Sequence, residues 1–119
     1  MKTVCTIKHI DCLFRAFADR TRLRVLSILR AEPELCVCDI MTVLRLPQAK
    51  TSRHLAYLRK AGLVRVWKQG LWSHYSLAPA QSSFHKSLLD CLANCFQEVP
   101  ELAQDLERLR LAKGSATCK

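Results

Sequence analysis

The feature that most restricts the fold is a change of hydrophobic period near the middle of the chain. The stretch LPQAKTSRHLAYLRKAG opens with a proline turn, carries Leu55 and Leu58 at helical spacing, and ends at Gly62. The stretch LVRVWKQGLWSHYSLA then alternates apolar and polar residues on both sides of Gln69-Gly70. We therefore predict a helix followed by a β-hairpin, with Gln69-Gly70 as the turn and a basic tip.

Helical spacing also runs through the segments on both sides of this unit. Before it, IKHIDCLFRAFAD and RTRLRVLSILRA carry apolar residues three and four positions apart, and Asp19 is placed to cap the second segment. Pro33 interrupts the pattern, and CVCDIMTVLR predicts a short helix joined to the next one by the tight connection RLPQ. After the hairpin, Ser82 or Ser83 is placed to cap the helix SSFHKSLLDCLANCF, and Pro100 separates it from a final helix, ELAQDLERLRLA. The residues that mark one apolar face of the first helix are Ile7, Ile10, Leu13, Phe14 and Phe17. The residues expected to point inward from the second helix are Leu23, Leu26, Ile28 and Leu29.

The predicted order is thus four helices, a hairpin and one or two further helices. A helix-turn-helix followed by a β-hairpin is a winged helix, so we predict a mainly α fold with a β-hairpin wing. At 119 residues the chain is expected to form a single domain over residues 1–119, with a flexible tail over residues 113–119. A chain this short gains stability by sharing its core with a second copy.

Charge is distributed unevenly along the chain. The formal net charge is +9, and no Asp or Glu occurs between Ile40 and Leu89. The same span carries the basic residues Arg45, Lys50, Arg53, Arg59, Lys60, Arg65, Lys68 and Lys86. A region of one sign is what a polyanion-binding surface needs, although a solvated basic surface would have the same composition. Because the basic span coincides with the predicted helix-turn-helix and hairpin, we interpret it as a site for double-stranded DNA.

The predicted recognition helix carries side chains suited to reading DNA. The second helix of a helix-turn-helix can lie in the major groove with its N-terminal residues toward base edges. Gln48 can pair with adenine through two hydrogen bonds, and Arg53 can pair with guanine in the same way. The other expected contacts are Lys50, Thr51, Ser52 and His54 with phosphates or bases, Arg59 and Lys60 with the backbone, and Lys68 and Gln69 with flanking phosphate or the minor groove.

The cysteine count is high for a chain of this length, with Cys5, Cys12, Cys36, Cys38, Cys91, Cys95 and Cys118. No apolar run is long enough to span a membrane, and the N-terminal residues lack the apolar core of a signal peptide, so a cytoplasmic protein is expected. A reducing compartment and an odd count disfavour a disulfide framework and favour metal or redox chemistry. For Cys12, Cys91 and Cys95, burial as small hydrophobic side chains is an equally good interpretation, and Cys118 is expected to be a residue of the tail.

Several blocks of the sequence resemble a known family. ELCVCD, SRHLAYLRKAGLV and KQGLWSHYSL occur in order and at suitable spacing, within a segment that runs from Phe14 to Leu77. This segment resembles the arsenical-resistance repressor (ArsR/SmtB) family of dimeric winged-helix metalloregulators, and it looks most like the arsenic-responsive members. The resemblance implies a homodimer built from the first and last helices, which binds operator DNA and blocks transcription. It also implies that a bound metal or metalloid weakens the grip on the operator.

The resemblance gives a role to the closely spaced Cys36 and Cys38, as thiolate ligands at the start of the helix before the recognition helix. Trivalent arsenic and antimony are soft and prefer thiolates, so As(III) or Sb(III), including methylated trivalent arsenicals, is the expected inducer. Residues two apart on a regular helix lie about 200° apart around its axis, so we expect binding to distort the first turn of that helix. A disulfide between these two cysteines would close a strained ring.

The sequence leaves the third ligand open. Arsenic-responsive relatives look like CVCDLC in this block, whereas this chain has Met41 at the position of the third cysteine. A thioether is a poor substitute for a thiolate. The alternatives are a two-coordinate site for a methylated arsenical, a thiolate from elsewhere, or a Met41 that serves the core only. The outside donors are Cys5 and Cys12, or the pair Cys91 and Cys95, which lie four apart on one helix.

Other functions stay open beside this one. A cadmium-, lead- or zinc-responsive repressor of the same fold and a thiol-redox-sensing repressor are the alternatives. An enzyme is not expected, because no cysteine is followed by an arginine at the spacing of an oxyanion-binding thiol loop. No His and Asp pair stands beside a cysteine in a nucleophilic arrangement either, and no catalytic cofactor is expected.

Overall fold

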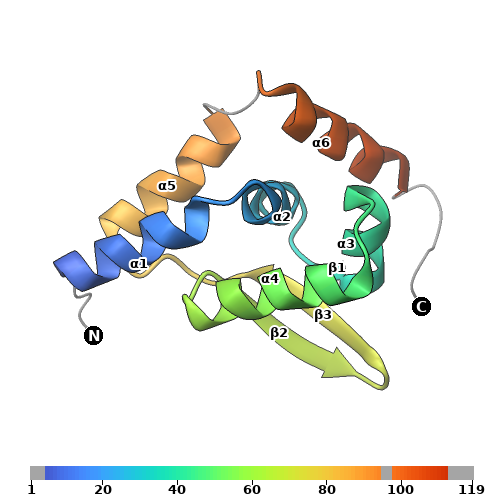
Figure 1. The fold of residues 1–119 in the computed structure, drawn as a ribbon, viewed down its shortest axis with the longest axis horizontal. Helices are drawn as coiled ribbons and strands as arrows, with labels where there is room; N and C mark the ends of the chain where they lie inside the picture. The colour runs from blue at the N-terminus through green and yellow to red at the C-terminus, as the bar shows by residue number, and fades with distance from the viewer. Residues whose placement is uncertain (1–4, 95–97, 113–119) are drawn as a thin grey trace.

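The helices and strands follow the predicted order. The computed structural model describes residues 5–94 and 98–112. The elements, labelled in Figure 1, are α1 (Ile7–Phe17), α2 (Arg20–Ala31), β1 (Leu35–Cys36), α3 (Val37–Leu44), α4 (Gln48–Lys60), β2 (Val64–Gln69), β3 (Trp72–Leu77), α5 (Ser83–Asn94) and α6 (Pro100–Ala112). The mainly α fold with a β-hairpin is thus confirmed, and the predicted tail over residues 113–119 lies outside the described residues. In the described part of the chain, no helix combines the length and apolar character that a membrane span requires.

The residues predicted to cap α2 and α5 lie at the first turns of these helices and form the expected hydrogen bonds. The side chain of Asp19 accepts a hydrogen bond from the backbone N–H of Arg22 at 3.0 Å. The Ser82 hydroxyl likewise accepts one from the backbone N–H of His85 at 3.0 Å. Such caps satisfy amide groups that otherwise lack a partner, and each stabilises its helix by about 1 kcal/mol. Pro100 is the first residue of α6, where the missing N–H costs no helical hydrogen bond.

Helix α2 forms the centre of the core. Figure 1 shows it between α1 and α5 on one side and α3 and α6 on the other, with α4 and the hairpin beneath. Residues 25–29 of α2 are buried without a break, as expected for a helix covered on several sides. The surrounding elements contribute the buried residues Leu13, Ile40, Leu44, Leu55, Leu58 and Leu63. Each fully buried leucine or isoleucine contributes about 1.5–3 kcal/mol through the hydrophobic effect.

The apolar face of α1 is only partly covered. Leu13 is buried, but Ile7 is 81% exposed and Phe14 is 54% exposed. Both belong to the apolar face that the periodicity marks, but α1 lies at the edge of the fold, so its own chain leaves part of that face uncovered. The Phe14 ring packs edge-on against Phe84 of α5, with 5.2 Å between ring centroids. Helices α1 and α5 therefore lie side by side and leave apolar side chains exposed.

The sheet has three strands, where the sequence predicts two. Strand β3 lies in the middle and pairs antiparallel with both β2 and β1. The register places Leu35 opposite Tyr75 and Cys36 opposite His74. The sequence does not predict β1, because two residues are too few to show an alternating pattern.

The hairpin turn lies one residue later than predicted. Gln69 pairs with Trp72, so the turn residues are Gly70 and Leu71. Gly70 has a φ of +62°, which suits the first central position of a type II′ turn, where glycine is favoured. The conformational freedom of this glycine therefore determines where the turn begins.

Candidate functional site

Helices α3 and α4 are joined by a tight turn, as the sequence RLPQ predicts. Arg45 follows α3 in the left-handed conformation, with a φ of +58°. The N–H of Leu46 donates to the carbonyl of Met41 at 3.1 Å, which closes the end of α3. Pro47 is extended and precedes the first turn of α4. The two helices are thus held together as a helix-turn-helix.

The outer side of α4 carries most of the predicted DNA contacts. The exposed members are Gln48, Ser52, Arg53, Arg59, Lys60, Lys68 and Gln69, and Lys50 is half-buried. Figure 1 shows α4 running beside the hairpin, which carries the last two of these residues. Neither α4 nor the hairpin contains an acidic residue. A basic surface of this kind attracts the phosphates of DNA.

Thr51 is not part of this surface, so its prediction as a DNA contact is wrong. Its side chain is fully buried, and its hydroxyl donates to the carbonyl of Pro47 at 3.0 Å. Thr51, Leu55 and Leu58 follow one another at spacings of four and three and form the inner face of α4. The sequence spacing already indicated that Thr51 is buried, because a residue four positions before a core leucine lies on the same side of the helix.

His54 contacts residues at the start of α2, and its role as a DNA contact stays a prediction. Its Nδ1 lies 3.3 Å from Nη1 of Arg22 and 3.8 Å from the carboxylate of Asp19, and its side chain is 12% exposed. Burial lowers the pKa of His54; Asp19 opposes this effect, while the nearby cations, Arg22 first among them, add to it. The lowered pKa favours the neutral imidazole, which has no charge to offer a phosphate.

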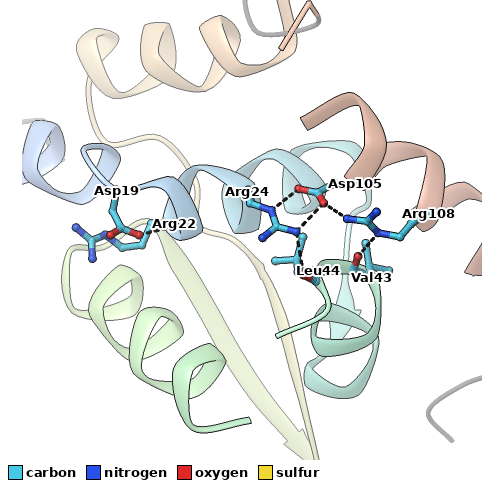
Figure 2. Close-up of polar contacts among 7 residues, drawn as sticks. All are labelled: Asp19, Arg22, Arg24, Val43, Leu44, Asp105 and Arg108. Carbon is cyan, nitrogen blue, oxygen red and sulfur yellow. Dashed lines mark hydrogen bonds and ion pairs between the residues drawn. The ribbon is translucent and has the colours of Figure 1, made fainter. Parts of the chain in front are cut away.

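Arg22, near the start of α2, contacts both α4 and the end of α1. Its guanidinium carbon lies 3.9 Å from the centre of the Tyr57 ring on α4. The same guanidinium donates to the carbonyls of Arg15 and Ala16 at 2.9 Å each, which satisfies groups at the end of α1. Figure 2 shows Asp19 and Arg22 next to each other at this end of α2. The sequence does not single out Arg22, because its partners come from two other helices.

Cys36 and Cys38 lie at the junction between β1 and α3, called the thiol junction below. Cys36 ends β1 in an extended conformation, with φ −72° and ψ 149°, and Cys38 lies in the first turn of α3. The prediction that a regular helical turn separates the two sulfurs by about 200° is therefore wrong, because Cys36 lies before the helix. Cys36 is 4% exposed, whereas Cys38 is a half-buried free thiol. A ligand shared by both sulfurs would act on the start of α3 and on β1 together.

His74 connects the thiol junction to the wing. Cys36 and His74 face each other in the β1–β3 pairing, and directly opposite side chains in an antiparallel pair lie on the same face. The His74 ring stacks on Trp67 of β2 with 4.6 Å between centroids, and its Nδ1 lies 3.6 Å from the carboxylate of Glu34. Among the described residues, Nε2 of His74 is buried without a hydrogen-bond partner. A change at Cys36 therefore acts directly on a residue of the hairpin itself.

The other candidate donors belong to different elements. Cys5 precedes α1 and Cys12 lies within it, and both are exposed free thiols; Cys91 is half-buried on α5. Figure 1 shows α1 and α5 across α2 from α3. Cys95 lies outside the described residues, so the predicted pair with Cys91 stays a prediction. Within residues 5–94 and 98–112, no group of three or more Cys, His, Asp or Glu residues is arranged to hold a metal ion.

The donor chemistry of the thiol junction fits a thiophilic ligand once the protein is reduced. Cys36 is disulfide-bonded in this structure, so the preference for free thiols drawn from the sequence is wrong for this residue. Its sulfur becomes a ligand only after that bond is reduced. Two soft sulfurs then suit a trivalent arsenical that needs two thiolates, or a three-coordinate ion that takes a further donor from elsewhere.

A buried ionic network holds α6 against the other end of α3 (Figure 2). Asp105 is 0% exposed, and its carboxylate accepts hydrogen bonds from Arg24 at 2.8 and 2.9 Å and from Arg108 at 2.7 Å. Arg24 also donates to the carbonyl of Leu44 at 2.8 Å, and Arg108 donates to the carbonyl of Val43 at 2.7 Å. These carbonyls end α3 and would otherwise lack helical partners. No local pattern reveals this network, because Arg24 and Asp105 are 81 residues apart.

Comparison with known sequences gives consistent matches over most of the chain. The profile of the bacterial regulatory protein arsR family matches residues 19–66, which include α2, α3 and α4. The arsenical resistance operon repressor of Escherichia coli (strain K12) is 43% identical over 97 residues, covering 81% of this chain and 83% of that protein. The arsenic resistance transcriptional regulator ArsR1 of Pseudomonas putida is 38% identical over 86 residues, covering 72% and 67%. A cadmium resistance transcriptional regulatory protein CadC homolog of Staphylococcus aureus is 37% identical over 65 residues, covering 55% and 54%.

Solved structures of regulators share the fold. HlyU from Vibrio cholerae N16961 superposes with a TM-score of 0.67 at 31% identity, covering 76% of this chain and 95% of that chain. The AntR antimony-specific transcriptional repressor superposes with a TM-score of 0.64 at 26% identity, covering 79% and 81%. The sequence and structure matches therefore agree on the same class of DNA-binding regulator.

Proposed function

Because this chain belongs to the arsR family of bacterial regulatory proteins and is a transcriptional repressor of that family, we propose that trivalent arsenic or antimony releases it from its operator. The inducer, which includes methylated trivalent arsenicals, binds to the thiolates of Cys36 and Cys38. One observation carries the proposal: this pair lies between the strand that pairs with the wing and the helix that precedes α4.

Operator binding is assigned to the outer side of α4 and to the tip of the hairpin. Gln48 and Arg53 are exposed near the start of α4, where a recognition helix contacts base edges. The members assigned to the DNA backbone and the flanking groove are Lys50, Ser52, Arg59, Lys68 and Gln69. The buried Thr51 is left out of this set, and His54, which contacts Arg22 and lies near Asp19, is not assigned a group on the DNA.

A homodimer is assigned to the exposed face of α1 and α5. Ile7 and Phe14 are exposed on α1, and Phe14 packs against Phe84 of α5. A second copy would cover these apolar groups, and a two-fold dimer would present two α4 helices to two half-sites. The last helix, α6, contributes less to the dimer interface, because its buried Leu102 and Leu109 pack within their own chain.

The inducer acts on the thiol junction. When both sulfurs bind one atom, Cys36 and Cys38 are drawn together, which shifts the end of β1 relative to the start of α3. The far end of α3 is held by Arg24 and Arg108, so the strain is taken up at β1 and its pairing with His74. A shift between the wing and α4 changes how a dimer matches its half-sites, and the operator is released.

The third donor differs among inducers. A methylated trivalent arsenical already carries one carbon and is satisfied by two thiolates, whereas arsenite and antimonite take a third. Cys5 and Cys12 of a second copy are the first candidates, because both are exposed. Cys91, together with Cys95, is the other candidate pair.

Operator release tests this proposal. The protein is reduced with a phosphine, the reductant is removed, and binding of a labelled operator fragment is followed by fluorescence anisotropy. Arsenite, antimonite and methylarsenite are each expected to release the fragment. The double variant Cys36→Ser/Cys38→Ser should bind the fragment as the parent does and stay bound when arsenite is added.

Two controls make this result specific. Arsenate, which is pentavalent and not thiophilic, is expected to leave the complex intact. Cys5→Ser and Cys12→Ser variants report the third donor, because they should weaken the response to arsenite more than the response to methylarsenite. Release of the double variant by arsenite at the parent's concentration contradicts the assignment of Cys36 and Cys38.

A thiol-redox-sensing repressor is the second candidate, and the disulfide at Cys36 is the observation that favours it. Oxidation and reduction of Cys36 would then alter the thiol junction in place of a bound ligand. In that case peroxide releases the operator fragment from the reduced protein, and arsenite does not.

A cadmium-, lead- or zinc-responsive repressor is a further candidate, favoured by the similarity to a cadmium resistance regulator. Cadmium would then release the operator fragment at lower concentration than arsenite. The same anisotropy titration, run with each ion, separates the two outcomes.

A further inference from the structure

A cavity unrelated to the thiols lies between α2, α6 and the start of α4. We propose that it binds a small organic carboxylate and that its occupation withdraws Lys50 from DNA. The cavity measures about 800 Å³, a size typical of small-molecule sites, and neither Cys36 nor Cys38 lines it. Only the second half of the proposal rests on the proposed function, because it requires DNA binding by α4.

The walls of the cavity carry an excess of positive charge. The charged side chains that line it are Arg20, Arg24, Lys50 and Arg108 against Glu101 and Asp105. Arg24 and Arg108 share the single carboxylate of Asp105. In the part of the chain that the structure describes, Arg20 and Lys50 have no ion pair with an acidic side chain. An anion in the cavity would supply the missing countercharge.

Apart from Thr21 and Gln104, the uncharged lining is apolar, which restricts the class of ligand. Leu23, Leu46, Val99 and Leu102 contribute these walls. A carboxylate matches the planar guanidinium groups of the arginines, and an apolar body attached to it would cover the leucines. Inorganic phosphate has no apolar part and would leave these walls in contact with water.

Lys50 connects the cavity to the DNA-binding surface. It lies in the first turn of α4, is half-buried, and lines the cavity. A lysine that neutralises a ligand carboxylate no longer neutralises a DNA phosphate, so operator binding weakens in a salt-dependent way. The slope of log affinity against log salt concentration should fall by about one when the cavity is filled.

Calorimetry with a matched pair of probes tests the cavity. The DNA-free, reduced protein is titrated with 2-naphthoate and with its neutral analogue 2-naphthamide. Saturable binding is expected for 2-naphthoate and much weaker binding for the amide. Arg20→Gln should weaken 2-naphthoate binding about threefold to fivefold, the loss of one partly exposed charge pair. Arg110→Gln is the matched control, because Arg110 is exposed on α6 and does not line the cavity.

Several results would overturn the proposal. Equal binding of the acid and the amide, no saturable binding of 2-naphthoate, or equal effects of the two arginine variants would each show that the cavity is not a carboxylate site. The second half is tested on the Cys36→Ser/Cys38→Ser variant, from which 2-naphthoate should release the operator fragment. If this variant holds operator and 2-naphthoate together, the role of Lys50 is wrong. If it does not bind operator at all, DNA binding and the role of Lys50 both fail, while the calorimetry still decides the cavity.

Discussion

Cys36 lies directly opposite His74 in the pairing of β1 with β3. This relationship joins the thiol junction to the wing through a strand of two residues. The His74 ring in turn stacks on Trp67 of β2. Cys36 of β1, His74 of β3 and Trp67 of β2 are therefore neighbours across the three strands of the sheet. A structural change that a ligand causes at Cys36 and Cys38 can therefore reach the hairpin through β1 and β3. It can also reach α4 through α3.

Arsenite binding should change the fluorescence of Trp67. The indole stacks on His74 at 4.6 Å, and His74 faces Cys36, so movement at the thiol junction alters the surroundings of the ring. Titration of the reduced protein should show a change in tryptophan emission that Trp67→Phe removes. Trp72→Phe should keep it, because Trp72 lies beside the hairpin turn. An unchanged response in Trp67→Phe would exclude this route.

Asp105→Asn should destabilise the fold strongly. The substitution removes the shared carboxylate of Arg24 and Arg108 and leaves two largely buried guanidinium groups without it. Breaking such a pair costs about 3–5 kcal/mol of unfolding free energy, measured by urea denaturation. Glu107→Gln on the same helix breaks only an exposed pair with Arg110 and is expected to have no measurable effect. Equal losses in the two variants would show that burial of Asp105 does not matter.

Stability should fall as the pH drops below about 6.5, the ordinary pKa of histidine. Burial, with a smaller effect of His9, lowers the pKa of His85, and burial also lowers the pKa of His54. The unfolded chain therefore binds more protons than the folded one in this range, so stability rises with pH. Urea denaturation should give a lower unfolding free energy at about pH 5.5 than at about pH 7.5, and His85→Asn should reduce the difference. A parent protein that is equally or more stable at the lower pH would contradict this.

Arg53 and Lys68 should affect DNA binding in different ways. Arg53→Ala is expected to cost about 1–3 kcal/mol and to relax specificity at one base pair, because the side chain is assigned to a base. Lys68→Ala should weaken binding to all sequences alike and lower the salt slope by about one. Anisotropy at several salt concentrations, with the operator and single-base variants of it, measures both effects. A uniform loss across sequences in Arg53→Ala would place that arginine on phosphate.

Local signals were enough to predict most of the fold. Asp19 and Ser82 cap the helices that they precede, and the period of three and four separates the inner leucines of α4 from its exposed side. Two local details were missed: β1 is too short to alternate, and Gly70 shifts the turn by one residue. The exposure of Ile7 could not be predicted, since a periodic pattern does not say how much of a helix face its own chain covers.

The candidate site was predicted less completely than the fold. The exposed positions of α4 follow from periodicity, and the same periodicity would have placed Thr51 inside. The place of Cys36 before α3 could not be predicted, because it depends on the pairing with His74. The network of Arg24, Asp105 and Arg108 depends on contacts between distant segments, which no local pattern records.

X-ray absorption at the arsenic edge tests most directly whether Cys36 and Cys38 hold the inducer. The reduced protein is loaded with methylarsenite until it releases the operator fragment, and the spectrum is compared with that of the Cys36→Ser/Cys38→Ser variant at the same loading. We predict arsenic bonded to two sulfur atoms in the parent and a loss of these sulfur neighbours in the variant. Arsenic without sulfur neighbours in the released parent, or the same sulfur neighbours in the variant, would contradict the proposed site.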